Sequence, residues 1–375
     1  MRLTQRLQLI KLTVLVGLLT SILLCPHLWA GERFFPKTTL FDNFLGVKAP
    51  YDYIHLVVLI LLILSSFLTQ KKLPGILLIL FSVYLCFDDQ NRLQPWFFNY
   101  ILILFILLFY RHRVDEPNNY TTVFISLQIL VALIYIFSGI QKMNESFVPD
   151  TFLWMVSSFD TVLSERQLQL ATKFGYVVPY FEISIGLLLL VKPLRFIVVP
   201  LVILMHLLIL IILGPMGKNY NMVVWPWNII MIALILLLFA NIKQERFFDI
   251  SFLFKGLSFY IVITLMLIFP MFSLKNQYDS YLSSSLYSSN LNDCQLILSN
   301  KAYEQLPYYL RHFATDSDNH HVLYIKRWAQ HELGVPCVPE YRIFKTVHKY
   351  VIDITGTDSK EVEFNFVERD KIIDF

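Results

Sequence analysis

The sequence predicts an all-α polytopic membrane bundle of about nine transmembrane helices, followed by a small C-terminal α+β extramembrane domain. Of the 375 residues, 56% are hydrophobic and only 16% are charged, whereas a soluble domain has about 25% charged residues. Runs such as 56–68 and 101–110 become long enough to cross a bilayer when their flanks are included. From Lys275 onward the sequence becomes more polar. These observations argue against a soluble globular protein and divide the chain into residues 1–274 and 275–375.

The first apolar run follows Arg2, Arg6 and Lys11 and ends at Cys25, just before a proline. No Ala-x-Ala cleavage site follows it, so we expect it to remain as the first membrane helix. Lys and Arg are denser in the loops that would lie inside if the N-terminus is cytoplasmic, which places the C-terminal domain outside. The expected spans are 10–29, 53–70, 74–88, 95–111, 120–140, 174–191, 196–214, 222–241 and 256–274.

Two loops expected on the outer side have unusual compositions. Residues 31–51 are rich in aromatic residues and proline, which favours a segment lying on the membrane surface. Between two expected helices, Asp88, Asp89 and Arg92 occur together with amide side chains and are followed by Pro95, which suits a first helical turn. This loop is either an ordinary polar hairpin or one wall of a polar cavity.

The stretch 135–144 ends a long apolar run and places Lys142 just past its boundary. An ammonium group there must reach water or line a polar cavity, because burying it in hydrocarbon is costly. Glu182 falls near the middle of the next expected span, where a carboxyl group normally faces the bundle interior. His206 lies within the span after that, and a lone membrane histidine is more often a hydrogen-bonded packing residue than a ligand.

Further polar groups are expected on the same face. Residues 145–173 contain too few apolar side chains for a span, so they form either an interfacial helix or a surface connector. The turn after the His206 helix contains Lys218 and Tyr220. In one interpretation, the fold brings these residues together with the other predicted polar residues, which are Asp88, Asp89, Arg92, Glu182 and His206. In that case Lys142, held at the edge of the apolar region away from water, can act as a base. The alternative is that the lysines reach lipid phosphates and the acids solvate the rim.

The C-terminal region reads as a strand at 294–298, an amphipathic helix at 322–333 ended by Gly334, and strands at 341–354 and 362–367. Four cysteines show neither a CxxC motif nor metal-ligand spacing, so no metal site is predicted. If the outside is oxidising, Cys294 and Cys337 could form a disulfide, a pairing that spacing alone leaves open. Cys25 and Cys86 are expected to be buried thiols. A net charge of +3 without a basic stripe gives no indication of nucleic-acid binding.

The order Ser-Gly-Ile-Gln-Lys-Met-Asn at 138–144, then Pro179 to Leu190 with Glu182 and Gly186, then His206, resembles the HTTM family. These membrane domains are related to vitamin K-dependent γ-carboxylase and share a four-helix core with DoxX-like and MauE-like membrane proteins. The loop at 88–96 also resembles the bacterial HTTM pattern, and the resemblance covers roughly residues 8 to 245. It implies a bacterial inner-membrane protein with an outward-facing site for a lipophilic quinol.

The carboxylase has a Lys-Lys-Leu-Asp run whose second lysine is the proposed base. Lys142 occupies that second position, but its neighbours here are Gln141 on one side and Met143 and Asn144 on the other. The tail is also far shorter than the lumenal region of the carboxylase. The resemblance therefore implies a fold and a quinol-facing site, not γ-carboxylation of glutamate.

Two functions from different classes remain. One is a membrane enzyme or enzyme subunit acting on an isoprenoid quinol or similar lipid, with Lys142 as the base. The other is a non-catalytic scaffold in the DoxX manner, which supports a redox enzyme and docks a soluble protein outside through residues 275–375. The sequence contains no clear inverted repeat of the kind that transporters show.

Overall fold

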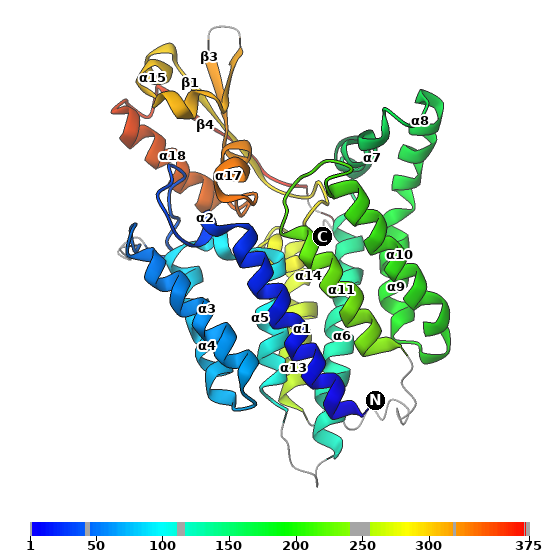
Figure 1. Cartoon of the computed structure of the whole chain (residues 1–375). Helices are drawn as coiled ribbons and strands as arrows, with labels where there is room; N and C mark the ends of the chain where they lie inside the picture. Colours follow the sequence, from blue (N-terminus) through cyan, green and yellow to red (C-terminus); the bar gives the residue numbers. More distant parts are fainter. Residues whose placement is uncertain are drawn as a thin grey trace.

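The computed structural model describes residues 2–41, 46–110, 117–240, 256–317, 320–370 and 372. Apolar helices lie side by side in one bundle, and a small sheet domain lies at one end of it (Figure 1). The N-terminus lies at the opposite end of the bundle (Figure 1).

The first half of the bundle is built from helices that begin and end at turn residues. Helix α1 (Leu3–Leu24) stops before Pro26, and α2 (Pro26–Trp29) follows as a short turn. Helices α3 (Asp52–Leu68) and α4 (Lys72–Asp88) come next. The short turn η1 (Gln90–Arg92) leads into α5 (Pro95–Leu107), which starts at a proline as expected.

Helix α6 (Pro117–Gln141) lies at the centre of the bundle and packs closely against α9 (Val178–Leu189). The close approach requires glycine at two places. A Cβ on Gly139 would lie 2.5 Å from the carbonyl oxygen of Pro179, and one on Gly186 would lie 2.6 Å from that of Ala132. Small residues let membrane helices approach backbone to backbone in this way.

The remaining helices complete the bundle. Helix α10 (Arg195–Leu213) packs against α9 and α11 (Val224–Phe239). A last apolar segment consists of α13 (Leu257–Ile263), η6 (Thr264–Ile268) and α14 (Phe269–Ser273) and packs against α6.

Three helical segments are long and apolar enough to cross a membrane: Leu3–Leu24, Tyr120–Gln141 and Lys192–Leu213. Shorter apolar helices occupy Asp52–Leu68, Pro95–Leu107, Val178–Leu189, Val224–Phe239 and Leu257–Ser273. A straight crossing needs about 20 residues. The helices therefore fall where the sequence places them, but nine crossings are not confirmed.

The segment between α6 and α9 is helical in short pieces. It contains η2 (Phe147–Phe152), α7 (Leu153–Val156), η3 (Ser157–Phe159), α8 (Glu165–Lys173) and η4 (Phe174–Tyr176). Ser164 caps α8 by accepting from the Gln167 N–H, and the Gln167 side chain accepts from Ser164 in return. Helix α8 extends beyond the bundle on the side of the sheet domain (Figure 1).

The sheet domain contains four antiparallel strands in the order β2-β3-β1-β4. Cys294, Leu296 and Leu298 are buried on one face of β1, an inner strand of this sheet. Helix α18 packs against the neighbouring strand β4 on that face. After the turn η7 (Tyr281–Ser283), the elements are β1 (Asp293–Leu298), α15 (Asn300–Gln305), α16 (Tyr308–Arg311), β2 (Ala314–Ser317), β3 (His320–Tyr324), α17 (Ile325–Leu333), α18 (Tyr341–Thr355) and β4 (Val362–Val367).

Two expectations for this domain need correction. Residues 341–354, expected as a strand, form the helix α18, because Ile343, Phe344, Val347 and Val351 recur at helical spacing and are all buried. The helix expected from 322 begins instead at Ile325, because the three residues before it belong to β3. The strands expected at 294–298 and 362–367 are confirmed.

All four cysteines are buried free thiols, so Cys294 and Cys337 do not form a disulfide in this structure. Burial raises the pKa of both thiols to about 12. Because the thiolate is the reactive form, we expect maleimide to label Cys294 and Cys337 about 1,000-fold more slowly at pH 8 than an exposed thiol. Mass spectrometry of the native and the denatured protein checks this, and complete labelling of the native protein within minutes would contradict it.

Candidate functional site

Lys142 and Glu182 form a buried ion pair between α6 and α9. Lys142 is 7% exposed and Glu182 6% exposed, and the Nζ–Oε2 distance is 2.8 Å. The ammonium also donates to the Oγ and the carbonyl oxygen of Ser138, at 2.6 and 3.1 Å. An ammonium has three donors, so the ion pair and these two bonds use all of them.

A second chain of hydrogen bonds links three helices nearby. Tyr135 of α6 lies 2.6 Å from His206 Nε2 on α10, and His206 Nδ1 lies 2.7 Å from Asn228 Oδ1 on α11. The Asn228 amide nitrogen donates to the carbonyl oxygen of Val224, which leaves Oδ1 as the acceptor. His206 therefore carries its proton on Nδ1 and accepts from the Tyr135 hydroxyl at Nε2.

These two groups form one polar region, which we call the core network: Tyr135, Ser138, Lys142, Glu182, His206 and Asn228. Tyr135 and Ser138 lie on successive turns of α6 below Lys142 and face the same neighbouring helices. The network thus joins α6, α9, α10 and α11 through paired polar groups. Buried polar groups in a membrane are stable only when they are paired in this way.

Arg92 is the centre of a second cluster, which lies between the bundle and the sheet domain. Its guanidinium is fully buried and donates to the carbonyl oxygens of Leu28, Trp29 and Leu85. It also pairs with Asp88 at 2.9 Å and lies 5.5 Å from the centre of the Trp29 ring. All hydrogen-bonding nitrogens of Arg92 are thereby occupied.

Asp89 is also fully buried and is surrounded by donors. It pairs with Arg33 and accepts from the N–H and hydroxyl of Thr38 and from Asn91. Burial works to raise the pKa of Asp89, but the positive charges of Arg33 and Arg92 outweigh it and hold the pKa below its ordinary value. The stability gained from this ionised carboxylate is present above about pH 4 and is lost as the pH falls through the lowered pKa.

The same loop holds the sheet domain. The N–H of Val338 donates to Asn91 Oδ1 at 3.2 Å, and Gln94 Nε2 donates to the carbonyl oxygen of Pro336 at 2.9 Å. Arg342 of α18 donates to Gln90 Oε1 at 2.6 Å. We call residues Asp88, Asp89, Gln90, Asn91, Arg92 and Gln94 the 88–94 cluster. It attaches the sheet domain to the membrane helices.

Residues 31–38 support the same attachment. Glu332 of α17 accepts from the backbone N–H groups of Phe34 and Phe35, and the Phe35 ring packs edge-on against Trp328 at 4.9 Å. That this loop lies on the membrane surface stays a prediction, and the structure adds that Phe35 packs against the sheet domain. The sheet domain covers the Phe35 ring completely, whereas the Phe34 ring stacks on Tyr309 and stays 45% exposed. Residues 42–45 lie outside the described residues.

Lys218 and Tyr220 belong to a third group, which lies against the segment between α6 and α9. Lys218 donates to Ser157 Oγ at 2.8 Å and lies 5.6 Å from the centre of the Trp154 ring. Tyr220 contacts the rings of Trp154 and Tyr287. Burial raises the pKa of Tyr220 to about 12, so its hydroxyl stays protonated.

The predicted site residues thus fall into three groups. Lys142, Glu182 and His206 belong to the core network. Asp88, Asp89 and Arg92 belong to the 88–94 cluster. Lys218 and Tyr220 lie together against Trp154, in the third group. Sequence reasoning missed Asn228 and Asn91 as hydrogen-bonding partners of His206 and Asp89. Asn228 had a usable signal, since an amide inside an apolar helix needs a hydrogen-bonding partner.

The core network lies almost entirely in the part of the chain that resembles a known family. Residues 120–223 match the model of the family described as Methylamine utilisation protein MauE. The match covers under a third of the chain and includes Lys142, Glu182 and His206, while Asn228 lies just beyond it. Comparison with curated proteins and with solved structures finds no match.

This match supports the MauE-like and DoxX-like part of the expected resemblance. It lends no support to the HTTM or γ-carboxylase part, nor to a quinone ligand. Together with the apolar helices, it identifies the chain as an integral membrane protein that is similar to the MauE family over residues 120–223.

Proposed function

We propose that this protein is a non-catalytic membrane scaffold that supports a redox partner protein and docks it through residues 275–375. In this proposal the N-terminus is cytoplasmic, the sheet domain lies outside a bacterial inner membrane, and lipid surrounds the bundle. The similarity to a methylamine utilisation family is consistent with a supporting role in an oxidative pathway.

The observation that carries the proposal is the state of the 88–94 cluster. Asp88, Asp89 and Arg92 are each fully buried, and their charges are paired with one another or with neighbouring basic side chains. Groups that act on a substrate need free hydrogen-bonding capacity facing it. Here that capacity is used within residues 28–92, where it fixes the loop. The loop's amides Gln90, Asn91 and Gln94 then hold the folded sheet domain on the membrane helices, which is what a docking platform requires.

The core network supports the same proposal. A lysine that acts as a base must present a free electron pair to its substrate. The Lys142 nitrogen has a partner for each of its three protons. We therefore assign the pair to the packing of α6 against α9, where it fixes how the two helices meet.

The test is genetic complementation. In a host that lacks this protein, we measure the yield and the activity of the redox enzymes outside the membrane. The double variant Lys142→Met with Glu182→Met keeps the volume of the pair and removes both charges. We expect the double variant to restore the yield and the activity of one redox enzyme as fully as the natural chain does. The reason is that a neutral, well-packed pair can replace a buried ion pair.

The second candidate function is an enzyme that acts on an isoprenoid quinol or similar lipid, with Lys142 as base and Glu182 and His206 as inner polar contacts. One observation favours it: an ion pair and a Tyr–His pair lie together at the end of the bundle that carries the sheet domain. In that case the double variant is inactive although it is folded. Co-purification of a stoichiometric quinone that is lost on Lys142→Ala would also favour the enzyme.

A further inference from the structure

The segment that joins α14 to β1 forms a loop whose two ends are held by the sheet domain. Ser280 donates through its N–H and its hydroxyl to Glu340 Oε1, at 2.8 and 2.6 Å. Asn292 donates to the carbonyl oxygen of Pro339 at 3.0 Å. Because Pro339 and Glu340 are neighbours in the chain, the ends of residues 281–291 lie close together, as in an Ω-loop. We call residues 281–291 the latch loop.

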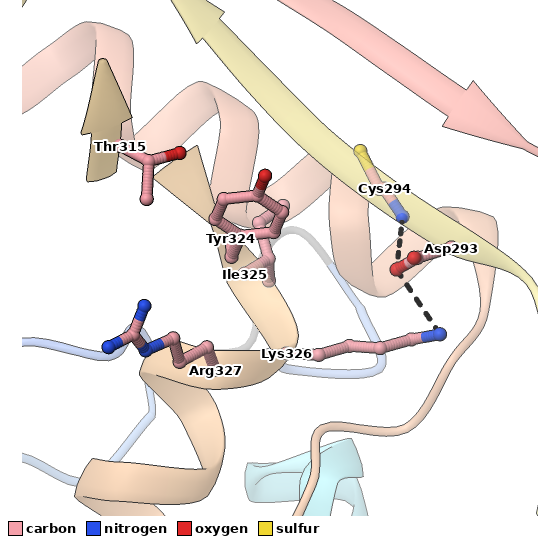
Figure 2. A pocket seen from close by; sticks show the side chains of 7 residues that line it. All are labelled: Asp293, Cys294, Thr315, Tyr324, Ile325, Lys326 and Arg327. Carbon is pink, nitrogen blue, oxygen red and sulfur yellow. Dashed lines mark hydrogen bonds and ion pairs between the residues drawn. The ribbon is translucent and has the colours of Figure 1, made fainter. Parts of the chain in front are cut away.

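The chain that follows the latch loop is fixed within the sheet domain. Asp293, the first residue of β1, accepts from the Cys294 N–H at 2.9 Å and pairs with Lys326 at 3.2 Å (Figure 2). Strand β1 then pairs with β3 on one side and with β4 on the other. A movement of the latch loop therefore requires no change in the sheet.

The tip of the latch loop, residues 284–290, contacts the end of α6 and the residues just after it. Asn144 donates to the carbonyl oxygen of Ser288 at 2.8 Å, and Asn290 donates to Gln141 Oε1 at 2.7 Å. Ser288 and Asn290 are both buried. The tip therefore covers a part of the chain that flanks, in sequence, the lysine of the core network.

Tyr287 attaches the tip to two further segments. Its ring lies nearly parallel to that of Trp154, with 6.4 Å between the ring centres, and 6.5 Å from the ring of Tyr220. Its hydroxyl accepts from Asn221 Nδ2 at 3.2 Å. Side chains from three separate segments thus hold the tip in its closed position.

The backbone of the tip is strained in this position. Ser284, Tyr287 and Ser289 have φ values of 61°, 58° and 58°, in the left-handed region that a Cβ atom disfavours. The other non-glycine residues with positive φ in the described chain are all asparagines, which tolerate this region better. Such strain persists only where surrounding contacts impose it, and it is typical of segments that switch between two positions.

The closed tip also keeps oxygen atoms away from water. Ser285 Oγ and Asn290 Oδ1 in the tip, and Asn144 Oδ1 next to it, are buried and have no hydrogen-bond partner among the described residues. A buried acceptor without a donor costs free energy that hydration returns. Opening the tip therefore relieves both the backbone strain and this second cost.

We propose that the latch loop switches between the closed position and an open one, in which residues 284–290 leave the bundle while the sheet and the helices stay folded. Opening uncovers Gln141 and Asn144, on either side of Lys142, and gives water and a partner protein access to this end of α6. The inference goes beyond the scaffold function and does not depend on it, because the strain and the contacts belong to the chain itself.

Ser288→Cys measures the opening, because Ser288 is fully buried when the loop is closed. Cys337 is equally buried and serves as the reference in the same molecule. The full-length variant in detergent is labelled with a maleimide at pH 8, and mass spectrometry follows both sites. We expect the introduced thiol to react at least about tenfold faster than Cys337, because local opening is less costly than opening the core of the sheet domain. Equal rates at the two sites would overturn the proposal.

Ser284→Gly and Ser284→Ala, each combined with Ser288→Cys, form a matched pair that tests the strain. Both substitutions remove the hydroxyl, but only glycine also removes the Cβ that disfavours the left-handed φ. We expect Ser284→Gly to slow labelling of the introduced thiol about threefold to fivefold, because it stabilises the closed position. Ser284→Ala should not slow it, and neither should change the labelling of Cys337. The same rate in both variants would show that the strain does not drive the opening.

Hydrogen exchange of the natural chain is a second measurement that needs no substitution. In the closed position the N–H of Ser285 donates to the carbonyl oxygen of Ser280, and the N–H of Asn290 donates to Ser288 Oγ. We expect both groups to exchange at least about 100-fold faster than the paired N–H groups of β1. Exchange at the rate of β1 would contradict the switch. Failure of complementation by the Lys142→Met, Glu182→Met variant would count against the scaffold function alone.

Discussion

Glu182→Ala should lower the free energy of unfolding by about 3–5 kcal/mol. The substitution leaves the Lys142 ammonium buried with only Ser138 as a partner. An unpaired charge at that depth is far more costly than a paired one, because neither water nor a counter-charge compensates it. The measurement is a denaturant titration of the purified protein in detergent, followed by tryptophan fluorescence.

The double variant Lys142→Met with Glu182→Met is the control for this effect. It removes the charge and the partner together, so we expect most of the lost stability to return. Recovery in the double variant separates the cost of a stranded charge from the cost of a lost contact. A Glu182→Ala protein as stable as the natural chain would show that water reaches Lys142, and the buried pair would then have no structural role.

Arg92→Met should have an effect of similar size, again about 3–5 kcal/mol, and should also loosen the sheet domain. The fully buried guanidinium bonds to three carbonyl oxygens and to Asp88. Its removal leaves these acceptors buried without a donor. Limited proteolysis provides the second measurement, with faster cleavage between residues 275 and 292 expected in the variant.

Arg342→Met is the matched control, because Arg342 bonds from the sheet domain to Gln90 of the same 88–94 cluster. Its side chain is 41% exposed and pairs with Asp279 in partial contact with water. We expect a loss of no more than about 1 kcal/mol. Equal losses from Arg92→Met and Arg342→Met would mean that burial does not decide the strength of this attachment.

The apolar helices could be located from the sequence because each is a continuous hydrophobic run that ends at polar residues, prolines or glycines. The sequence predicts a strand at 341–354 where the structure has the helix α18, since the stripe of Ile343, Phe344, Val347 and Val351 also contains short alternations. Burial against the sheet decides in favour of the helical period.

The candidate site was predictable in its members but not in its grouping. Lys142 and Glu182 stand out as charges next to or inside apolar runs. Their contact depends on the close approach of α6 and α9 at Gly139 and Gly186, which neither residue indicates by itself. The role of the 88–94 cluster is not predictable from the sequence, because its partners Pro336 and Val338 follow it by more than 200 residues and belong to the C-terminal domain.

The contact between Asn91 and Val338 joins residues that are 247 positions apart. At a synthesis rate of about 5–20 residues per second, roughly 10–50 s pass between the emergence of the two residues from the ribosome. During this interval the Asn91 side chain has no Val338 N–H to bind, although the helices on either side can already be inserted. The membrane part is therefore completed only after translation of the last third of the chain, and a chain that stops early exposes the polar loop to proteases.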